Sequence, residues 1–248
     1  MNKRRETPLL KDLVEKHHCT MGLRHEMLAK APFFKDLPTE DLTAINKLFN
    51  AGHFSLGDVI YYEEEPATRL RVVVSGKIKL MRQTLEGKNV LIDVLKPGEF
   101  FGTLSNLGDD TYTETAITQT HSCILSIHAK DFRRILNEYP LVTLKVLDLT
   151  ADRLKASRDN LLELSTLPVE KRIASIMLKL SKKFGEANDV GLLIQMPLTR
   201  KDLADMAATS TETASRVMSQ FKKDGIIDAG RQWVAITGKK QLAQAVDR

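Results

Sequence analysis

The residues best suited to chemistry lie near the C-terminus, where polar side chains recur with helical spacing. Ser215 and Arg216 follow Glu212 by three and four residues, which places both beside Glu212 on one face of a helix. An arginine fork there can donate to O6 and N7 of guanine, and a glutamate one turn earlier can accept from N4 of cytosine. The same spacing also occurs in ordinary exposed Glu–Arg pairs, which stabilise a helix by about 0.2–0.5 kcal/mol. The pattern alone fits either a base-reading helix or a solvated ion pair.

This pattern lies in the second of two short segments that have helical apolar spacing. They are Thr199–Ala207 and Ser210–Lys223, each with a hydroxyl side chain at its start that can cap a helix, and a tight turn around Ala208-Thr209 joins them. This arrangement is typical of a helix-turn-helix, whose second helix enters the major groove of DNA. The candidate DNA-contacting residues are Thr199, Arg200, Ser210, Thr211, Glu212, Ser215, Arg216, Gln220 and Lys223.

Charge is distributed unevenly along the 248-residue chain. The net charge of +5 divides into +3 for residues 1–38 (8 basic, 5 acidic), −3 for residues 39–167 (15 basic, 18 acidic) and +5 for residues 168–248 (14 basic, 9 acidic). A basic C-terminal third joined to a mildly acidic middle indicates that a polyanion such as double-stranded DNA binds at the C-terminal end.

The middle of the chain, from about residue 51 to residue 127, has short apolar runs interrupted by glycine. Turn signals such as Gly57-Asp58, Ser75-Gly76 and Pro97-Gly98 separate these runs, which predicts an antiparallel β-roll of about eight strands. We therefore expect an α+β fold with four parts. These are a mobile basic arm (1–23), a β-roll with flanking helices (24–139), a long helix (140–167) and a winged helix-turn-helix (168–248).

The long helix is predicted to begin at Pro140 and to end near Thr166. Its spacing forms a heptad seam over three heptads, made of Leu144, Leu147, Ala151, Leu154, Arg158 and Leu161. A helix of this length extends about 40 Å at 1.5 Å per residue, more than a small β-roll can cover. We expect the seam to pair with its copy in a homodimer.

The order of these parts resembles the CRP/FNR family, named for the cyclic-AMP receptor and the fumarate–nitrate-reduction regulator. The similarity covers about residues 28–246 and is most specific in Thr199–Ile227, with further matches in the glycines of the β-roll. It implies a homodimeric transcription regulator that reads a DNA palindrome and has RNA polymerase as a further partner. Because the β-roll region lacks a close cluster of two or three histidines with a carboxylate, we do not expect an enzyme. The pattern Glu212-x-x-Ser215-Arg216 is similar to the FNR branch, which reads TTGA-type or TGNGA-like half-sites.

The resemblance also indicates where an effector pocket would lie. The corresponding residues are Gly102, Thr103, Leu104, Thr113 and Glu114. Nucleotide-binding members carry a glutamate where this chain has Thr103 and an Arg-Ser pair near Thr113, whereas no arginine occurs here between Gly98 and Ile127. A cyclic phosphate then lacks a fork-shaped partner, so we expect DNA binding without cyclic nucleotide or cofactor. The alternative is a sensor that needs a cyclic nucleotide, haem or a metal.

The chain contains two cysteines, Cys19 in the arm and Cys123 in the β-roll. Two thiols are too few for a disulfide framework or a four-thiolate iron–sulfur cluster, and they fit a reducing compartment. His17, His18, Cys19 and His25 could bind a metal or haem, but in a mobile arm we expect them to be solvated and the chain to hold no metal. Because the sequence lacks an apolar signal peptide or membrane span, we expect a cytoplasmic protein.

Overall fold

The computed structural model describes residues 7–9, 19–103 and 110–247. It divides into two compact units, one within residues 14–156 and the other comprising residues 157–248 with the described residues of the N-terminal arm up to Leu9. No helix in the described ranges is long and apolar enough to cross a membrane.

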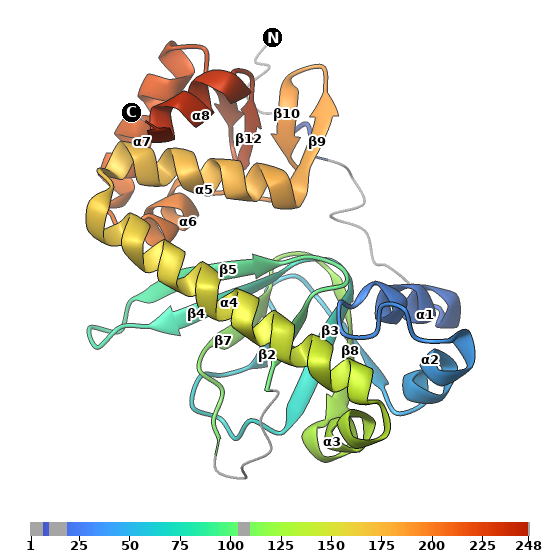
Figure 1. Cartoon of the computed structure of the whole chain (residues 1–248). Helices are drawn as coiled ribbons and strands as arrows, with labels where there is room; N and C mark the ends of the chain where they lie inside the picture. The colour runs from blue at the N-terminus through green and yellow to red at the C-terminus, as the bar shows by residue number, and fades with distance from the viewer. Residues whose placement is uncertain (1–6, 10–18, 104–109, 248) are drawn as a thin grey trace. The chain divides into compact units, whose positions relative to one another are not determined.

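The first unit contains an antiparallel β-roll, as the turn spacing predicts (Figure 1). Its strands are β1 (Asn50–Phe54), β2 (Val59–Tyr61), β3 (Arg69–Ser75), β4 (Ile78–Gln83), β5 (Asn89–Leu95), β6 (Phe100–Gly102), β7 (Thr115–Thr118) and β8 (Ser122–His128). They form two sheets, with the orders β1-β8-β3-β6 and β2-β7-β4-β5. Strand β3 is buried on both faces, and the buried set includes the charged side chain of Arg71 as well as apolar ones.

The two faces of β3 lie in two separate cores. Val73 packs between the two sheets with Phe101 and Ile124, among others. Leu70 and Val72 point the other way, into a larger core formed with the helices. This division follows from the two-residue period of a strand.

Four helices flank the β-roll or lead out of it: α1 (Met21–Lys30), α2 (Thr39–Asn46), α3 (Ala129–Glu138) and α4 (Pro140–Thr166). Helix α4 has the predicted bounds. The prediction of a mobile arm up to residue 23 is wrong at its end, because α1 begins at Met21. The Thr20 side chain caps this helix by accepting a hydrogen bond from Leu23 N at 3.3 Å.

The two cysteines are joined in a disulfide, which corrects the expectation of a solvated Cys19 and a reduced, unpaired Cys123. Cys19 packs against the larger core and Cys123, in β8, is fully buried. Their Cα atoms lie 5.9 Å apart although 104 residues separate them in sequence. Pairing over that separation depends on the tertiary fold, which brings Cys19, two residues before α1, onto β8.

The second unit is a winged helix-turn-helix, as predicted. Its elements are α5 (Val169–Phe184), β9 (Gly185–Asn188), β10 (Gly191–Ile194), α6 (Arg200–Met206), α7 (Thr211–Lys223), β11 (Ile227–Gly230), β12 (Trp233–Ile236) and α8 (Lys239–Asp247). The four strands form one sheet in the order β11-β12-β10-β9. Leu9 of the N-terminal arm packs against Leu193, Trp233 and Ala235 of this sheet.

Candidate nucleic-acid interface and effector pocket

The first helix of the helix-turn-helix is fixed by a reciprocal cap. The Thr199 hydroxyl accepts a hydrogen bond from Asp202 N at 3.0 Å, and the Asp202 carboxylate accepts from Thr199 N at 2.9 Å. Both groups satisfy backbone donors that a helix start leaves unpaired. Thr199 is therefore engaged in capping α6.

The second helix, α7, is capped and packed in the same unit. Ser210 Oγ accepts from Thr213 N at 3.1 Å. Four residues with the spacing of one helix face, Ala214, Val217, Met218 and Phe221, are buried. This packing leaves the opposite face of α7 directed away from the core.

The outward face of α7 carries most of the predicted DNA-contacting residues. Thr211, Glu212, Arg216, Gln220 and Lys223 are exposed, and Ser215 is half-buried. Within the described residues, Glu212, Arg216 and Lys223 have no hydrogen-bond or ion-pair partner. The solvated Glu–Arg pair is therefore not formed. Gln220 differs, because its side-chain amide donates to Asp224 Oδ1 at 2.8 Å.

Arg200 is placed differently from the residues on α7. It is half-buried, and its Nη1 donates to the Ser215 backbone carbonyl at 3.4 Å. Arg200 thus braces α6 against α7, a role that the sequence pattern did not indicate.

Helix α4 has two apolar stripes. The inner stripe, Val142, Val146 and Leu149, packs against the larger core of the β-roll unit. The predicted seam residues lie on another face and are all exposed: Leu144, Leu147, Ala151, Leu154, Arg158 and Leu161. Leu154 is 54% exposed and Leu161 is 64% exposed, so this chain alone leaves a leucine stripe uncovered.

The predicted effector pocket is built around Gly102, at the end of β6. Its φ of +89° suits glycine, and a Cβ at this position would lie 2.5 Å from the Arg69 carbonyl oxygen and 3.4 Å from Arg71 Nη1. Thr103 is buried, and its N–H donates to the same carbonyl at 3.2 Å. Leu104 lies outside the described residues.

An arginine that the sequence analysis missed lies beside this glycine. The expectation that the pocket has no guanidinium is wrong, because Arg71 reaches it from β3 and not from the segment after Gly98. Arg71 is 9% exposed. The signal was present in the alternation of Arg69 and Arg71 along a buried strand, since residues two apart share a face.

The Arg71 guanidinium already has partners within the chain. Its Nη1 donates to the Tyr112 hydroxyl at 2.8 Å, and its Cζ lies 4.7 Å from the Tyr61 ring centroid and 5.3 Å from that of Tyr112. The two rings stack with centroids 3.8 Å apart. Cation–π and hydrogen-bond contacts therefore stabilise this buried charge without a ligand.

The two remaining predicted pocket residues also interact with each other and with this cluster. The Thr113 hydroxyl donates to the Glu114 carboxylate, and the Tyr61 hydroxyl donates to Glu114 Oε1 at 3.3 Å. Burial raises the pKa of Tyr61, and the negative charge of Glu114 raises it further. The phenol is thus held in its protonated, donating form.

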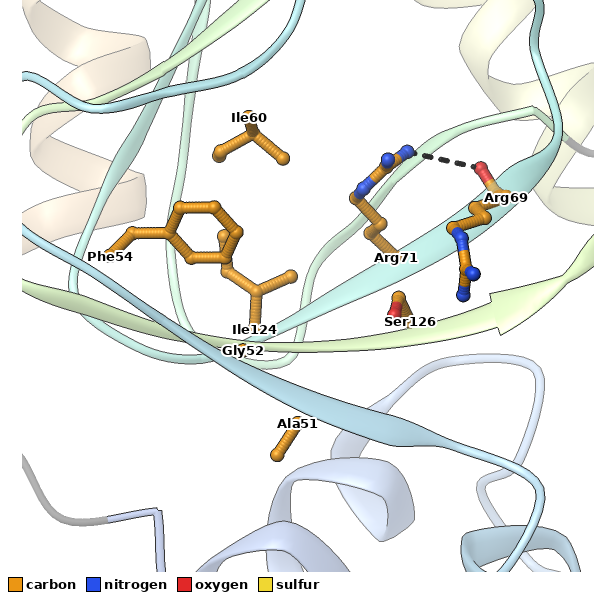
Figure 2. A pocket seen from close by; sticks show the side chains of 8 residues that line it. All are labelled: Ala51, Gly52, Phe54, Ile60, Arg69, Arg71, Ile124 and Ser126. Atoms are coloured by element: carbon orange, nitrogen blue, oxygen red, sulfur yellow. Dashed lines mark hydrogen bonds between the residues drawn. The ribbon is translucent and has the colours of Figure 1, made fainter.

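A cavity of about 210 Å³ adjoins Arg71. Figure 2 shows Phe54, Ile60 and Ile124 on one side and the two arginines on the other, with Arg71 bonded to the Arg69 carbonyl oxygen. Within the described ranges, no cluster of three or more histidine, cysteine or acidic side chains has metal-binding geometry. His17 and His18 lie outside the described residues, and His25 contacts the Thr43 hydroxyl.

Comparison with known families gives matches over both units. A cyclic nucleotide-binding domain model matches residues 52–139, and a Crp-like helix-turn-helix domain model matches residues 171–245. The chain belongs to the CRP/FNR family. Its homologues are transcription regulators of this type with a helix-turn-helix DNA-binding domain.

Individual CRP/FNR relatives support the same assignment. The chain is 28% identical over 223 residues to the "CRP-like cAMP-activated global transcriptional regulator" of Mycobacterium tuberculosis, covering 90% of this chain and 96% of that one. It is 27% identical to "Transcriptional activator protein FnrL" of Cereibacter sphaeroides, covering 83% and 84%. The solved structure of FixK2 from Bradyrhizobium japonicum shares the fold, with a TM-score of 0.71, 21% identity and coverage of 79% and 96%.

Proposed function

We propose that this CRP/FNR protein is a homodimeric regulator that binds double-stranded DNA sequence-specifically through α7. The observation that carries the proposal is the outward face of α7, where Glu212 and Arg216 are exposed one turn apart and unpartnered within the described chain. Free guanidinium and carboxylate groups with this spacing match the donors and acceptors of G·C pairs in the major groove. The Lys223 ammonium, which has no partner among the residues that the structure describes, suits a phosphate contact at the same face.

The exposed leucine stripe of α4 supports the homodimer. Pairing two copies of the stripe buries leucines that one chain leaves open to water, and each fully buried leucine contributes about 1.5–3 kcal/mol. A two-fold dimer presents two α7 helices, so its site is a palindrome with half-sites about 10 base pairs apart. The Glu212-x-x-Ser215-Arg216 pattern favours TTGA-type or TGNGA-like half-sites, and RNA polymerase is the further partner that such a regulator addresses.

We also propose that DNA binding requires no cyclic nucleotide. In this account Arg71, Tyr61 and Tyr112 occupy the region beside Gly102, and the guanidinium is satisfied by Tyr112. A cyclic phosphate would have to displace that hydrogen bond and approach Glu114, whose carboxylate repels it. A ligand shifts a conformational equilibrium only by its differential affinity for the two states, and these costs reduce that difference.

A second candidate, activation by cyclic AMP, is favoured by the cavity beside Arg71. The Mycobacterium tuberculosis relative is named as cAMP-activated. In this alternative Arg71 would exchange the Tyr112 hydroxyl for the cyclic phosphate. Calorimetric titration with cyclic AMP and cyclic GMP separates the two candidates, because only the second requires binding below millimolar concentration.

Selection of bound sequences from a random double-stranded DNA pool tests the proposal as a whole. Ligand-free protein is expected to enrich an inverted repeat with a G·C pair in each half-site at the position read by Arg216. Loss of enrichment at that position in Arg216→Ala, with the repeat spacing unchanged, would assign the contact. Absence of any enriched sequence would contradict the proposal.

A further inference from the structure

The cavity of about 210 Å³ in the β-roll unit is lined by strands of both sheets, β1, β3 and β8 from one and β2 from the other. None of the lining residues that the structure describes is one of the predicted effector-pocket residues between Gly102 and Glu114, although Arg71 borders both places. The cavity is therefore a candidate site of its own.

One side of this cavity is an apolar wall formed by Phe54, Ile60 and Ile124 (Figure 2). Gly52 leaves space for the Phe54 ring, because a Cβ at Gly52 would lie 2.9 Å from Phe54 Cε2. A cavity of about 150 Å³ with such a lining holds one benzene molecule. The larger volume here has room for a six-membered ring with one small polar substituent.

The other side of the cavity carries the guanidinium groups of Arg69 and Arg71. Arg69 Nη2 lies 2.9 Å from His128 Nε2, which must accept because a guanidinium only donates, so this imidazole is neutral. Arg71 Nη1 donates to the Tyr112 hydroxyl at 2.8 Å and to the Arg69 carbonyl oxygen at 3.4 Å. Among the described residues, neither arginine forms an ion pair with a carboxylate.

Two neighbouring cations without a carboxylate partner in the described chain favour an anion at this place. Arg71 is buried and Arg69 is half-buried, so their solvation by water is reduced while their charges repel each other. Arg69 is the better placed for direct contact, because a guanidinium offers more N–H donors than the single His128 contact uses. Arg71, which the Tyr112 hydroxyl holds, adds positive charge beside it.

We propose that this cavity binds a small apolar monocarboxylate of about the size of benzoate, with the carboxylate at Arg69 and the apolar body against the Phe54 wall. A planar carboxylate matches the guanidinium fork with two parallel hydrogen bonds. The additional oxygens of a phosphate would face apolar side chains and lose hydrogen bonds to water. Binding at this cavity is independent of the DNA-binding function proposed above.

The test uses the full chain with isotope-labelled isoleucine methyl groups, titrated by NMR with benzoate and separately with benzyl alcohol, which has the same ring and no charge. Ring currents of bound benzoate should shift the methyl signals of Ile60 and Ile124. Signals of Ile194 and Ile236, buried in the second unit, should stay unchanged. We expect a benzoate dissociation constant below about 1 mM and binding of benzyl alcohol at least about tenfold weaker, the lower end of what a hydrogen bond to a charged group contributes.

Two variants remove the charge and the space separately. Arg69→Gln keeps an amide that can donate to His128, so benzoate affinity should fall at least about tenfold while benzyl alcohol affinity stays within about twofold. Ser126→Leu keeps both arginines and fills the cavity, so both ligands should lose their saturable shifts. Arg82→Gln, on β4 and outside the cavity lining, is the matched control and should bind benzoate as the natural chain does.

Absence of a saturable shift at millimolar benzoate, or benzoate binding that persists unchanged in Ser126→Leu, would overturn the monocarboxylate site. Benzyl alcohol or inorganic phosphate binding as tightly as benzoate would also overturn it, because the cavity would then recognise only the ring or only the charge. The ligand comparison in the natural chain decides the question even where a substitution impairs folding. Displacement of benzoate by cyclic AMP would assign the cavity to the nucleotide instead, and none of these results alters the test of DNA binding by α7.

Discussion

Two arginines, one in the β-roll and one on α7, have opposite surroundings. Arg71 is buried, donates to Tyr112 at 2.8 Å and lies over two aromatic rings. Arg216 is exposed and, among the described residues, has no partner. A buried charge requires such compensation within the fold, whereas an exposed one is already solvated by water. Arg71 therefore contributes to the folded state, and Arg216 is available to a partner.

The two faces of α4 show the same contrast with apolar side chains. Val142 is buried against its own β-roll, but Leu154 is 54% exposed. Arg71 and Val142 thus have their contacts within the core of the β-roll unit. Arg216 and Leu154 are exposed on the proposed DNA-binding and dimer surfaces. Substitutions at the two kinds of position should separate stability from binding.

The largest effect is expected from Leu154→Glu. Dimerisation would bring two carboxylates together in an apolar seam, at a cost of about 3–5 kcal/mol for an uncompensated buried charge. We expect a folded monomer by sedimentation, with palindrome binding weaker by about 100-fold or more, at 1.4 kcal/mol per tenfold. Ala156→Glu, also exposed but off the seam, should remain dimeric. A dimeric Leu154→Glu protein would show that the stripe is not the interface.

Arg216→Ala should weaken specific DNA binding by about 1–3 kcal/mol per half-site and relax the preference at one G·C pair. Because Arg216 has no partner within the described chain, the free energy of unfolding should stay unchanged. Titrations against the selected palindrome and single-base variants measure the first effect, and urea unfolding measures the second. Unchanged discrimination between the palindrome and its variants would remove Arg216 from the reading face.

Arg71→Met should show the opposite behaviour. Loss of a charge-assisted hydrogen bond, with Tyr112 left in a buried position, should lower the free energy of unfolding by about 1.5–3 kcal/mol. DNA affinity per folded dimer should be unchanged. Arg82→Met is the matched control, because the Arg82 side chain is largely exposed and its ion pair with Glu63 is expected to contribute at most about 1 kcal/mol. An Arg71→Met protein as stable as the natural chain would indicate that the guanidinium is held in reserve for a ligand.

The smallest effect is expected from Lys223→Ala. If the ammonium meets a phosphate, affinity should fall about equally for all sequences, and the slope of log K against log salt should decrease in magnitude by about one. Lys222→Ala provides the comparison, because Lys222 is held by the Asp228 carboxylate and the Ala229 carbonyl oxygen. A slope that stays constant in Lys223→Ala would remove the phosphate contact.

The sequence was most informative where local rules decide the structure. The bounds of α4 follow from Pro140 and the heptad spacing, and α7 follows from its Ser210 cap and its buried face. Local rules say nothing about which distant residues meet. The bridge between Cys19 and Cys123 spans 104 residues, and Arg71 reaches Gly102 from another strand. A spacing pattern likewise does not fix side-chain positions, so it could not predict that Arg216 has no partner among the described residues.

We propose above that this chain reads a palindrome through α7 without a nucleotide. An anisotropy titration of the nucleotide-free protein, with its disulfide intact, against the selected palindrome measures this directly. The titration is then repeated at 1 mM cyclic AMP. That concentration is well above a dissociation constant of ~1 μM, which corresponds to about −8.2 kcal/mol. We expect tight binding in both titrations, with affinities that agree within about twofold, well below the fivefold or greater effect typical of allosteric coupling. Binding that appears, or strengthens about tenfold, only when cyclic AMP is present would contradict it.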